Sequence, residues 1–279
     1  MTERDYNIWF NVRRISDDLW SIEDMGFEIS YLMTGSDKAL LIDTGFGMGD
    51  ISAVVEEITS LPLIVVNTHA HPDHAGGDDR FPEVYLHEKD LRLIDVIFSR
   101  HKREEVREHG RTFMAKKQIN IDDISDFDID RWMNARPNGI IPVSHGAGFN
   151  LGDRTVEVFS LPGHTPGCIV LLDRKTKRIF AGDSIIEKHP VWLHLEESSP
   201  LHVYHDALVS LSAEMKNFNE IYSAHMKEAI HPSIIHDLRN ASEEILSGKA
   251  KGRHFKTFAG EGFFHRYNRG AIIYRENGI

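Results

Sequence analysis

Three histidines and an aspartate occupy positions 69 to 74 of the chain, as His69, His71, Asp73 and His74. Imidazole nitrogens and carboxylate oxygens are ligands that suit zinc and similar divalent ions. The cluster follows the apolar run at residues 63–66, which is typical of a strand. Because alternate side chains of an extended chain share a face, His69 and His71 can converge on one ion. A turn would then direct Asp73 and His74 toward a second ion, so the pattern predicts two neighbouring metals.

The cluster resembles the His-x-His-x-Asp-His signature of the metallo-β-lactamase superfamily, which it matches without a substitution. A short segment such as Pro-Gly-His or Gly-Asp-Ser would by itself indicate only a turn, because Gly and Pro favour turn dihedrals. Here the family's remaining motifs occur in the family's order, so chance agreement is a poor explanation, and the resemblance covers about residue 28 to residue 275. The segments concerned are residues 40–45 (LLIDTG), 161–167 (LPGHTPG), 180–184 (FAGDS) and 223–225 (SAH).

The resemblance implies two divalent ions, with zinc as the expected metal and iron or manganese as alternatives. A histidine that binds a metal normally donates its other ring nitrogen to a carboxylate or carbonyl, and Asp43 is our candidate for such a partner. The implied ligands are His69, His71 and His164 for the first ion, Asp73, His74 and His225 for the second, and Asp183 as the bridge between them.

Hydrophobic patterns predict two β-rich halves, each accompanied by helices, which indicates a sheet-on-sheet sandwich flanked by helices. The resemblance implies the same α/β fold, the four-layered αββα metallo-β-lactamase sandwich with its metals at one edge. The expected strands are at residues 29–34, 39–42, 63–66, 84–86, 155–160, 169–172, 178–181 and 271–274, and the expected helices at 50–58, 200–218 and 232–246.

We interpret residues 1–279 as one metallo-β-lactamase-like domain, since 279 residues with 41% hydrophobic content can form one large core. A charged helical stretch from about residue 88 to 117 opens a longer helical insertion at about 88–140. Its length between motifs suggests a lid over the active site or an oligomer contact, so a homo-oligomer is compatible with the sequence.

Charge and composition narrow the range of partners. The 32 basic and 43 acidic residues give a formal net charge of -11, which argues against binding of long nucleic acids. Cys168 is the sole cysteine, so the chain forms no internal disulfide, which fits a reducing compartment. The N-terminal residues do not resemble a signal peptide, and no apolar run approaches the ~20 residues that span a bilayer. We therefore expect a cytoplasmic protein that binds a small-molecule substrate and no membrane.

The paired ions predict the chemistry. A metal ion lowers the pKa of bound water from ~15.7 to about 7, so a hydroxide that bridges two ions would be the nucleophile at neutral pH. Asp73 is the candidate catalytic residue, since it would orient this hydroxide and pass its proton to the leaving group. The predicted function is a binuclear metal-dependent hydrolase that attacks a small ester, thioester, lactone or amide.

Two other activities of the same fold remain open: a mononuclear iron persulfide dioxygenase that uses a subset of the ligands, and a small-molecule phosphodiesterase. Glyoxalase II is similar in length and ligand set, but the C-terminal part has no clear basic segment for glutathione. As candidate substrate contacts we take Phe46 and Met48, which follow the Asp43 turn, His194, in the loop after Asp183, and His265, in an aromatic segment.

Overall fold

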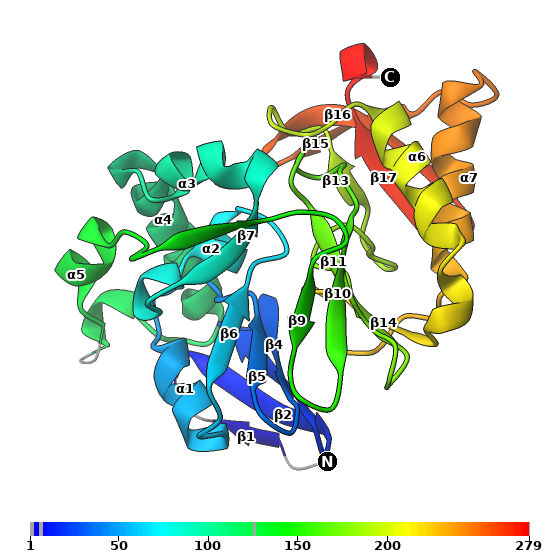
Figure 1. Ribbon diagram of the computed structural model, residues 1–279. Helices are drawn as coiled ribbons and strands as arrows, with labels where there is room; N and C mark the ends of the chain where they lie inside the picture. The colour runs from blue at the N-terminus through cyan, green and yellow to red at the C-terminus, as the bar shows by residue number, and fades with distance from the viewer. Residues whose placement is uncertain (1–2, 6–7, 125–126, 279) are drawn as a thin grey trace. The chain divides into compact units, whose positions relative to one another are not determined.

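Three β-sheets organise the part of the chain that the computed structural model describes, residues 3–5, 8–124 and 127–278 (Figure 1). The chain divides into two compact units. Unit 1 consists of Met1–Val143 and Phe149–Arg154, and unit 2 of Ser144–Gly148 and Thr155–Ile279. The chain passes from one unit to the other at residues 143/144, 148/149 and 154/155, and the second of these points lies in the short strand β9 (Gly148–Asn150). The single domain over 1–279 and the role of the insertion at 88–140 stay predictions, and residues 1, 2, 6, 7, 125, 126 and 279 lie outside the described residues.

Unit 1 is built on an eight-stranded sheet in which the strands follow one another in chain order. The strands from β1 to β5 pair antiparallel, and those from β5 to β8 pair parallel. The strands are β1 (Glu3–Asp5), β2 (Phe10–Ser16), β3 (Leu19–Asp24), β4 (Glu28–Thr34), β5 (Ala39–Ile42), β6 (Leu63–Val66), β7 (Val84–His87) and β8 (Ile140–Val143).

The predicted strands of this half are confirmed, and β5 shows why they were recognisable. All four of its residues are buried, as expected for a central strand whose two faces are both covered, and such strands read as solid apolar runs. The predicted helix that follows is also confirmed as α1 (Ile51–Ile58), with Asp50 at its N-cap accepting the backbone N–H groups of Ser52 and Ala53. The hairpin of β2 and β3 was not predicted, because charged residues interrupt its apolar alternation.

The helical stretch predicted at 88–117 is formed by α3 (Leu91–Ile97) and α4 (Arg100–Lys116), and α5 (Ile129–Asn134) follows them. Despite its charge, α4 is more than a solvated helix. Val106, Met114 and Arg103 on α4 and Trp132 on α5 are buried, and Val106, Met114 and Trp132 belong to the hydrophobic core of unit 1. The insertion therefore contributes side chains to the core that supports the loops after β5 and β6.

Unit 2 contains two further sheets. One has the order β14-β12-β11-β10 and the other the order β13-β17-β16-β15. The predicted strands at 155–160, 169–172, 178–181 and 271–274 are confirmed as β10, β11, β12 and β17, whereas β13, β14, β15 and β16 were not predicted. The strands are β10 (Thr155–Ser160), β11 (Ile169–Asp173), β12 (Arg178–Phe180), β13 (Val191–Leu193), β14 (Glu220–Tyr222), β15 (Arg253–Thr257), β16 (Gly260–Tyr267) and β17 (Gly270–Tyr274).

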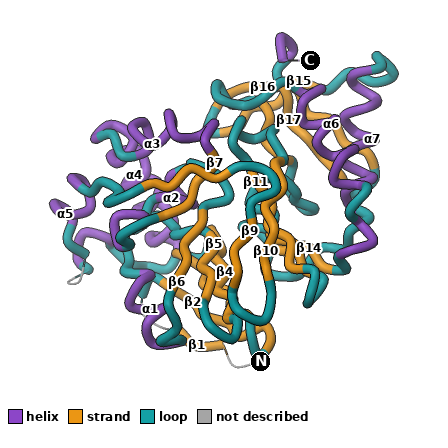
Figure 2. Tube along the Cα trace, in the orientation of Figure 1, coloured by secondary structure: helices purple, strands orange, loops and turns teal. Residues whose placement is uncertain are grey.

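Two helices, α6 (Leu201–Ser212) and α7 (Ile234–Leu246), lie side by side next to β17 (Figure 2). Their apolar faces meet the side chains of β13 and β17 in one large core cluster, which includes Leu208, Leu238 and Ile272. Both helices fall within predicted helical ranges. Among the described residues, no helix combines the length and the hydropathy needed to cross a bilayer.

Candidate metal centre

In unit 1, four of the predicted ligands follow β6, at the edge where its parallel neighbours also end. The chain leaves β6, passes through His69 and His71, and enters the short helix α2 (Pro72–Ala75) with Pro72 at its first position, where a missing N–H costs nothing. His69 and His74 are buried, whereas His71 and Asp73 are partly exposed. His69 Nε2 lies 3.1 Å from His71 Nδ1. Two imidazole nitrogens that face each other at this distance are also arranged to share a cation.

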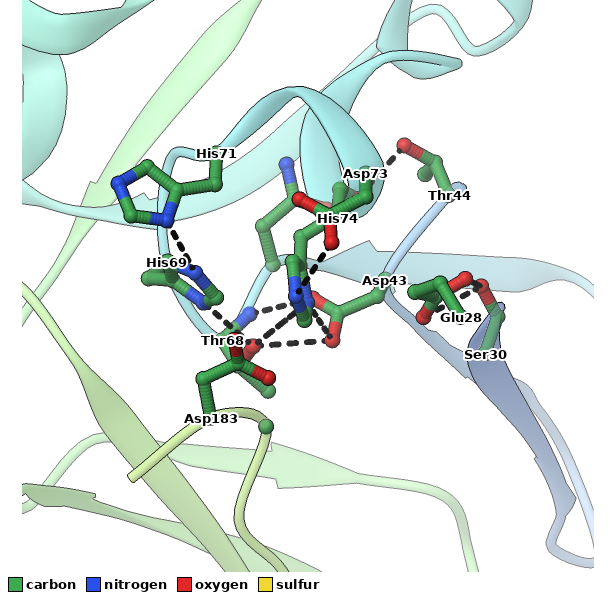
Figure 3. A network of polar contacts seen from close by, with 12 residues as sticks. Glu28, Ser30, Asp43, Thr44, Thr68, His69, His71, Asp73, His74 and Asp183 are labelled. Carbon is green, nitrogen blue, oxygen red and sulfur yellow. Dashed lines mark hydrogen bonds and ion pairs between the residues drawn. The ribbon is translucent and has the colours of Figure 1, made fainter. Parts of the chain in front are cut away.

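Asp43 ties this cluster to the end of β5 (Figure 3). Its carboxylate accepts the backbone N–H of Thr68 at 2.7 Å and the Thr68 hydroxyl at 2.9 Å. Its Oδ2 also lies 2.9 Å from His74 Nδ1. A carboxylate in this position holds the proton of His74 on Nδ1, which leaves the lone pair on Nε2 for a cation. His74 Nε2 lies 3.7 Å from Asp73 Oδ2, so two donor atoms of different chemistry converge there.

A second buried carboxyl, Glu28, lies behind Asp43 and was not recognised from the sequence. Glu28 is fully buried, and Ser30 Oγ donates to it at 3.2 Å. Ligand atoms of Glu28, Asp43 and His74 all lie within 4.8 Å of one another. Burial raises the pKa of Glu28 well above its usual range, His74 opposes this shift, and Asp43 adds to it. A glutamate at the start of a strand carries no local signal of burial, so only the packing reveals it.

The loop between Asp43 and α1 is held by a third buried carboxyl, Asp24. Its Oδ2 accepts the backbone N–H of Phe46 at 2.8 Å. Gly45 in this loop has φ +68°, and a Cβ there would lie 2.5 Å from Asp24 Oδ2, so the close approach requires glycine. Burial raises the pKa of Asp24 to about 7, partly offset by the Phe46 hydrogen bond.

This pKa predicts an unusual pH dependence of stability. Between the ordinary pKa of 3.8 and about 7, the folded state holds a proton on Asp24 that the unfolded chain releases. Stability should therefore fall as pH rises through this window, by up to about 4 kcal/mol at about 1.4 kcal/mol per pKa unit. Asp24→Asn removes the effect and keeps an acceptor for Phe46. In chelator, the unfolding free energy of Asp24→Asn relative to wild type should increase from pH 4 to pH 8.

The matched control is Asp95→Asn, which changes an exposed aspartate on α3. Denaturant unfolding at each pH should give the Asp95→Asn variant the wild-type profile. Parallel profiles for wild type and Asp24→Asn would contradict the assigned pKa.

In unit 2, the other three predicted ligands meet at one edge of the β14-β12-β11-β10 sheet. β12 and β14 are parallel, with Phe180 opposite Tyr222, so Asp183 and His225, each three residues further on, emerge together. β10 runs in the same direction, because both β10 and β12 pair antiparallel with β11. The loop after β10 therefore brings His164 to the same edge.

The geometry of this triad centres on Asp183, whose two oxygens face different histidines. Asp183 Oδ2 lies 3.4 Å from His164 Nε2, and Asp183 Oδ1 lies 3.1 Å from His225 Nε2. His164 Nδ1 donates to the carbonyl of Trp192 at 2.7 Å, which leaves the Nε2 lone pair toward Asp183. A carboxylate with a histidine nitrogen at each oxygen is suited to bridging two cations. The donor sets of both units, neutral imidazoles and carboxylates, fit zinc or a similar ion.

Comparison with known proteins identifies the family. The sequence pattern of the Metallo-beta-lactamase superfamily matches residues 26–225, which include all seven predicted ligands and Asp43. The chain belongs to this superfamily. The predicted fold class, the α/β metallo-β-lactamase fold, is confirmed. The chain is a metallo-hydrolase of this superfamily.

Relatives and solved structures of this superfamily resemble the chain over most of its length. The human acyl-coenzyme A thioesterase MBLAC2 is 25% identical over 201 residues, 64% of this chain and 67% of that protein. The hydroxyacylglutathione hydrolase GloC of Haemophilus influenzae is 27% identical over 159 residues, 54% of this chain and 62% of that protein. A metallo-β-lactamase structure from Erythrobacter litoralis superposes with a TM-score of 0.60 at 16% identity. The superposition covers 87% of this chain and 100% of that chain.

The four predicted substrate contacts lie in different environments in this metallo-β-lactamase fold. Phe46 and Met48 are 6% and 2% exposed and pack into the core of unit 1, so the expected apolar wall is part of the core instead. His265 points to the helical side of its sheet, with Nε2 2.9 Å from Glu244 Oε2 on α7, and it contacts none of the ligands of unit 2.

His194 is the one predicted contact of unit 2 that lies near a ligand loop. Its ring packs edge-on to Trp192 at 5.3 Å between centroids, and Trp192 provides the carbonyl that holds His164. Burial, with a contribution from Arg275, lowers the pKa of His194. His194 is therefore neutral at neutral pH.

Proposed function

We propose that this metallo-β-lactamase-fold protein is a binuclear metal-dependent hydrolase and that thioesters are its substrates among the predicted esters, thioesters, lactones and amides. The observation that carries the proposal is the Asp183 triad, in which each carboxylate oxygen faces a different histidine. A site for a single ion would not need a carboxylate placed in this way. Together with the four ligands after β6, the triad provides enough donors for two ions.

The residues of the chain have distinct roles in this proposal. Bound divalent ions would supply an ionised water at neutral pH and would polarise the carbonyl that is attacked. Asp43 holds the orientation of His74, and the Trp192 carbonyl holds that of His164. Asp73, partly exposed beside His74, would orient the attacking water and move a proton to the leaving group.

The choice of thioesters is supported by two relatives. One is an acyl-coenzyme A thioesterase and the other a hydroxyacylglutathione hydrolase, so the substrates that their names give carry an acyl group on a thiol. A thiolate is a good leaving group, and attack by hydroxide on the polarised carbonyl needs no nucleophilic side chain. Ser184, beside Asp183, is buried and donates to the carbonyl of Leu161, which is a structural role.

A hydrolysis screen tests the proposal. Purified protein loaded with zinc, manganese or iron is assayed on thioesters, lactones, aryl esters, β-lactams and bis-aryl phosphodiesters, with metal content measured in parallel. We expect two ions per chain and the highest kcat/KM on thioesters, with loss of activity on chelation. One iron per chain with oxygen uptake on a persulfide would replace the hydrolase with the dioxygenase. A preference for phosphodiesters would establish the phosphodiesterase alternative.

A further inference from the structure

The sheet β13-β17-β16-β15 of unit 2 has two faces of different character. Side chains alternate between the faces along each strand. One face carries Val191, Ile272 and Tyr274, which belong to the core beneath α6 and α7. The opposite face, which we call the aromatic platform, carries the residues between them: Trp192 and His194 near β13, Ile273 on β17, Phe264 and Arg266 on β16, and Arg253 and Phe255 on β15.

Strand register aligns the platform residues, with the fully buried Ile273 between Trp192 and Phe264. Trp192 is opposite Ile273, Ile273 is opposite Phe264, and Phe264 is opposite Arg253, so these four side chains form one row across four strands. Phe255 extends the row, with its ring centroid 5.6 Å from that of Phe264. Trp192, Phe255 and Phe264 are all partly exposed. No helix of unit 2 in the described part of the chain covers these three rings in the way that α6 and α7 cover the other face.

Two exposed arginines place positive charge on the platform. The guanidinium of Arg253 lies 5.0 Å from the Phe264 ring centroid, and that of Arg266 lies 5.7 Å from it. Among the described residues, neither arginine takes part in an ion pair with a carboxylate, although the chain has 43 acidic residues. Two guanidiniums on one ring, in a protein of net charge -11, are suited to an anion that comes from outside the chain.

The platform reaches the metal ligands of unit 2 through Trp192. The carbonyl of Trp192 accepts the hydrogen bond from His164 Nδ1, so the backbone that orients a ligand also orients the indole. At the tip of the β15–β16 hairpin, Phe258 is 71% exposed, and its ring packs edge-on to Trp192 at 5.1 Å. His194 Nε2, 2.9 Å from Thr257 Oγ1, fastens this tip to β13.

We propose that the aromatic platform binds the carrier half of the thioester, a thiol that contains an aromatic base and phosphate groups, as coenzyme A does. This inference rests on the proposed thioesterase function and assigns its leaving group. The base would stack on the rings of Phe258 and Trp192, since every nucleobase has a face that stacks on aromatic side chains. The phosphates would bind Arg253 and Arg266 through charge-assisted hydrogen bonds.

The chemistry of the platform distinguishes this carrier from glutathione. Glutathione is a peptide thiol without an aromatic ring or a phosphate. Its carboxylates could also pair with the guanidiniums, but the exposed aromatic rings would add little to its binding. A nucleotide-bearing thiol uses both features. We therefore expect coenzyme A thioesters to be preferred over glutathione thioesters of the same acyl group.

Binding of free coenzyme A to the metal-loaded protein tests the platform without any hydrolysis. Isothermal titration should show that Arg253→Gln and Phe258→Ala each weaken binding by about tenfold. The matched controls are Lys216→Gln, which makes the same charge change at an exposed site, and Val209→Ala, which truncates an exposed apolar residue of α6. Both controls should bind coenzyme A as the wild type does.

Kinetics supply a second readout. The platform variants should raise KM for an acyl-coenzyme A about tenfold at unchanged kcat, and should leave KM unchanged for the same acyl group on N-acetylcysteamine, which lacks the nucleotide. Equal coenzyme A affinity in wild type and both platform variants would overturn the inference. The inference would also be overturned if the wild type formed a dimer without binding coenzyme A, and if only the platform variants were monomeric. The platform would then be an interface between two copies of the chain. If coenzyme A binds at the platform but no thioester is hydrolysed, the proposed function fails and the binding site stands.

Discussion

Asp183→Asn is expected to lower thioester hydrolysis by on the order of a thousandfold, because several kcal/mol of transition-state stabilisation by the metals would be lost. The carboxylate oxygens of Asp183 face His164 Nε2 and His225 Nε2, and an amide of the same size replaces one of them with a hydrogen-bond donor. The charge that would hold two cations together is removed as well. Metal content measured by mass spectrometry should fall below two ions per chain.

A surface aspartate provides the control for this experiment. Asp206→Asn on α6 makes the same chemical change at an exposed position of unit 2, and it should retain wild-type activity and metal content. Thermal unfolding in chelator separates misfolding from the loss of a ligand, since the metal-free variants should unfold alike. Full metal occupancy with full activity in Asp183→Asn would remove this residue from the centre.

Arg103→Met is expected to destabilise the protein by about 2–4 kcal/mol, through the loss of cation–π contacts and of two hydrogen bonds to backbone carbonyls. The Phe46 carbonyl keeps the Trp132 indole N–H as a donor, whereas the Gly76 carbonyl loses its arginine donor. The guanidinium of Arg103 is 2% exposed and lies between the rings of Phe98 and Trp132, 4.4 Å and 4.6 Å from their centroids. Its two terminal nitrogens donate to the carbonyl of Phe46 at 3.3 Å and to that of Gly76 at 3.1 Å.

These two carbonyls make Arg103 a positioning residue for the metal centre. Phe46 lies in the loop that follows Asp43, and Gly76 comes directly after α2, which carries Asp73 and His74. Burial lowers the pKa of Arg103 to about 10, so the side chain stays charged at neutral pH. One guanidinium thus joins the loop of the Asp43 carboxylate to the helix of two ligands, and its loss should also weaken metal binding.

Metal affinity and unfolding free energy, measured together, test this role. Arg103→Lys keeps the charge but cannot lie flat between two rings or donate to both carbonyls, so it should rescue little of either property. Arg100→Ala, on the same helix but exposed, is the control and should change stability by less than about 0.5 kcal/mol. If Arg103→Met were as stable as wild type and bound metal equally well, the hydrogen bonds from Arg103 to the two carbonyls would contribute nothing to stability or to metal binding.

The candidate ligand residues and the family's motifs could be recognised in the sequence, because metal binding demands particular side chains at particular local spacings. His69, His71, Asp73 and His74 lie on one short segment, so their residue types and spacing are enough to predict metal binding. About half of the strands could also be predicted, chiefly those with both faces covered, as in β5, because a solid apolar run is recognisable without knowledge of its neighbours. β15 and β16 were missed because exposed charged side chains interrupt their pattern.

The amino-acid sequence by itself determined the superfamily, the kinds of ligand and the prospect of paired metals. Only the tertiary structure showed which other residues support the candidate metal centre. It buries Glu28 and Asp24, and it lets Arg103 donate to carbonyls of the loop after Asp43 and of Gly76 after α2. It also brings Arg253, Phe258 and Trp192 together in one sheet and the hairpin at its end. The physical reason is that burial, a raised pKa or an aromatic platform depends on which distant segments pack together, and such contacts leave no local pattern in the chain.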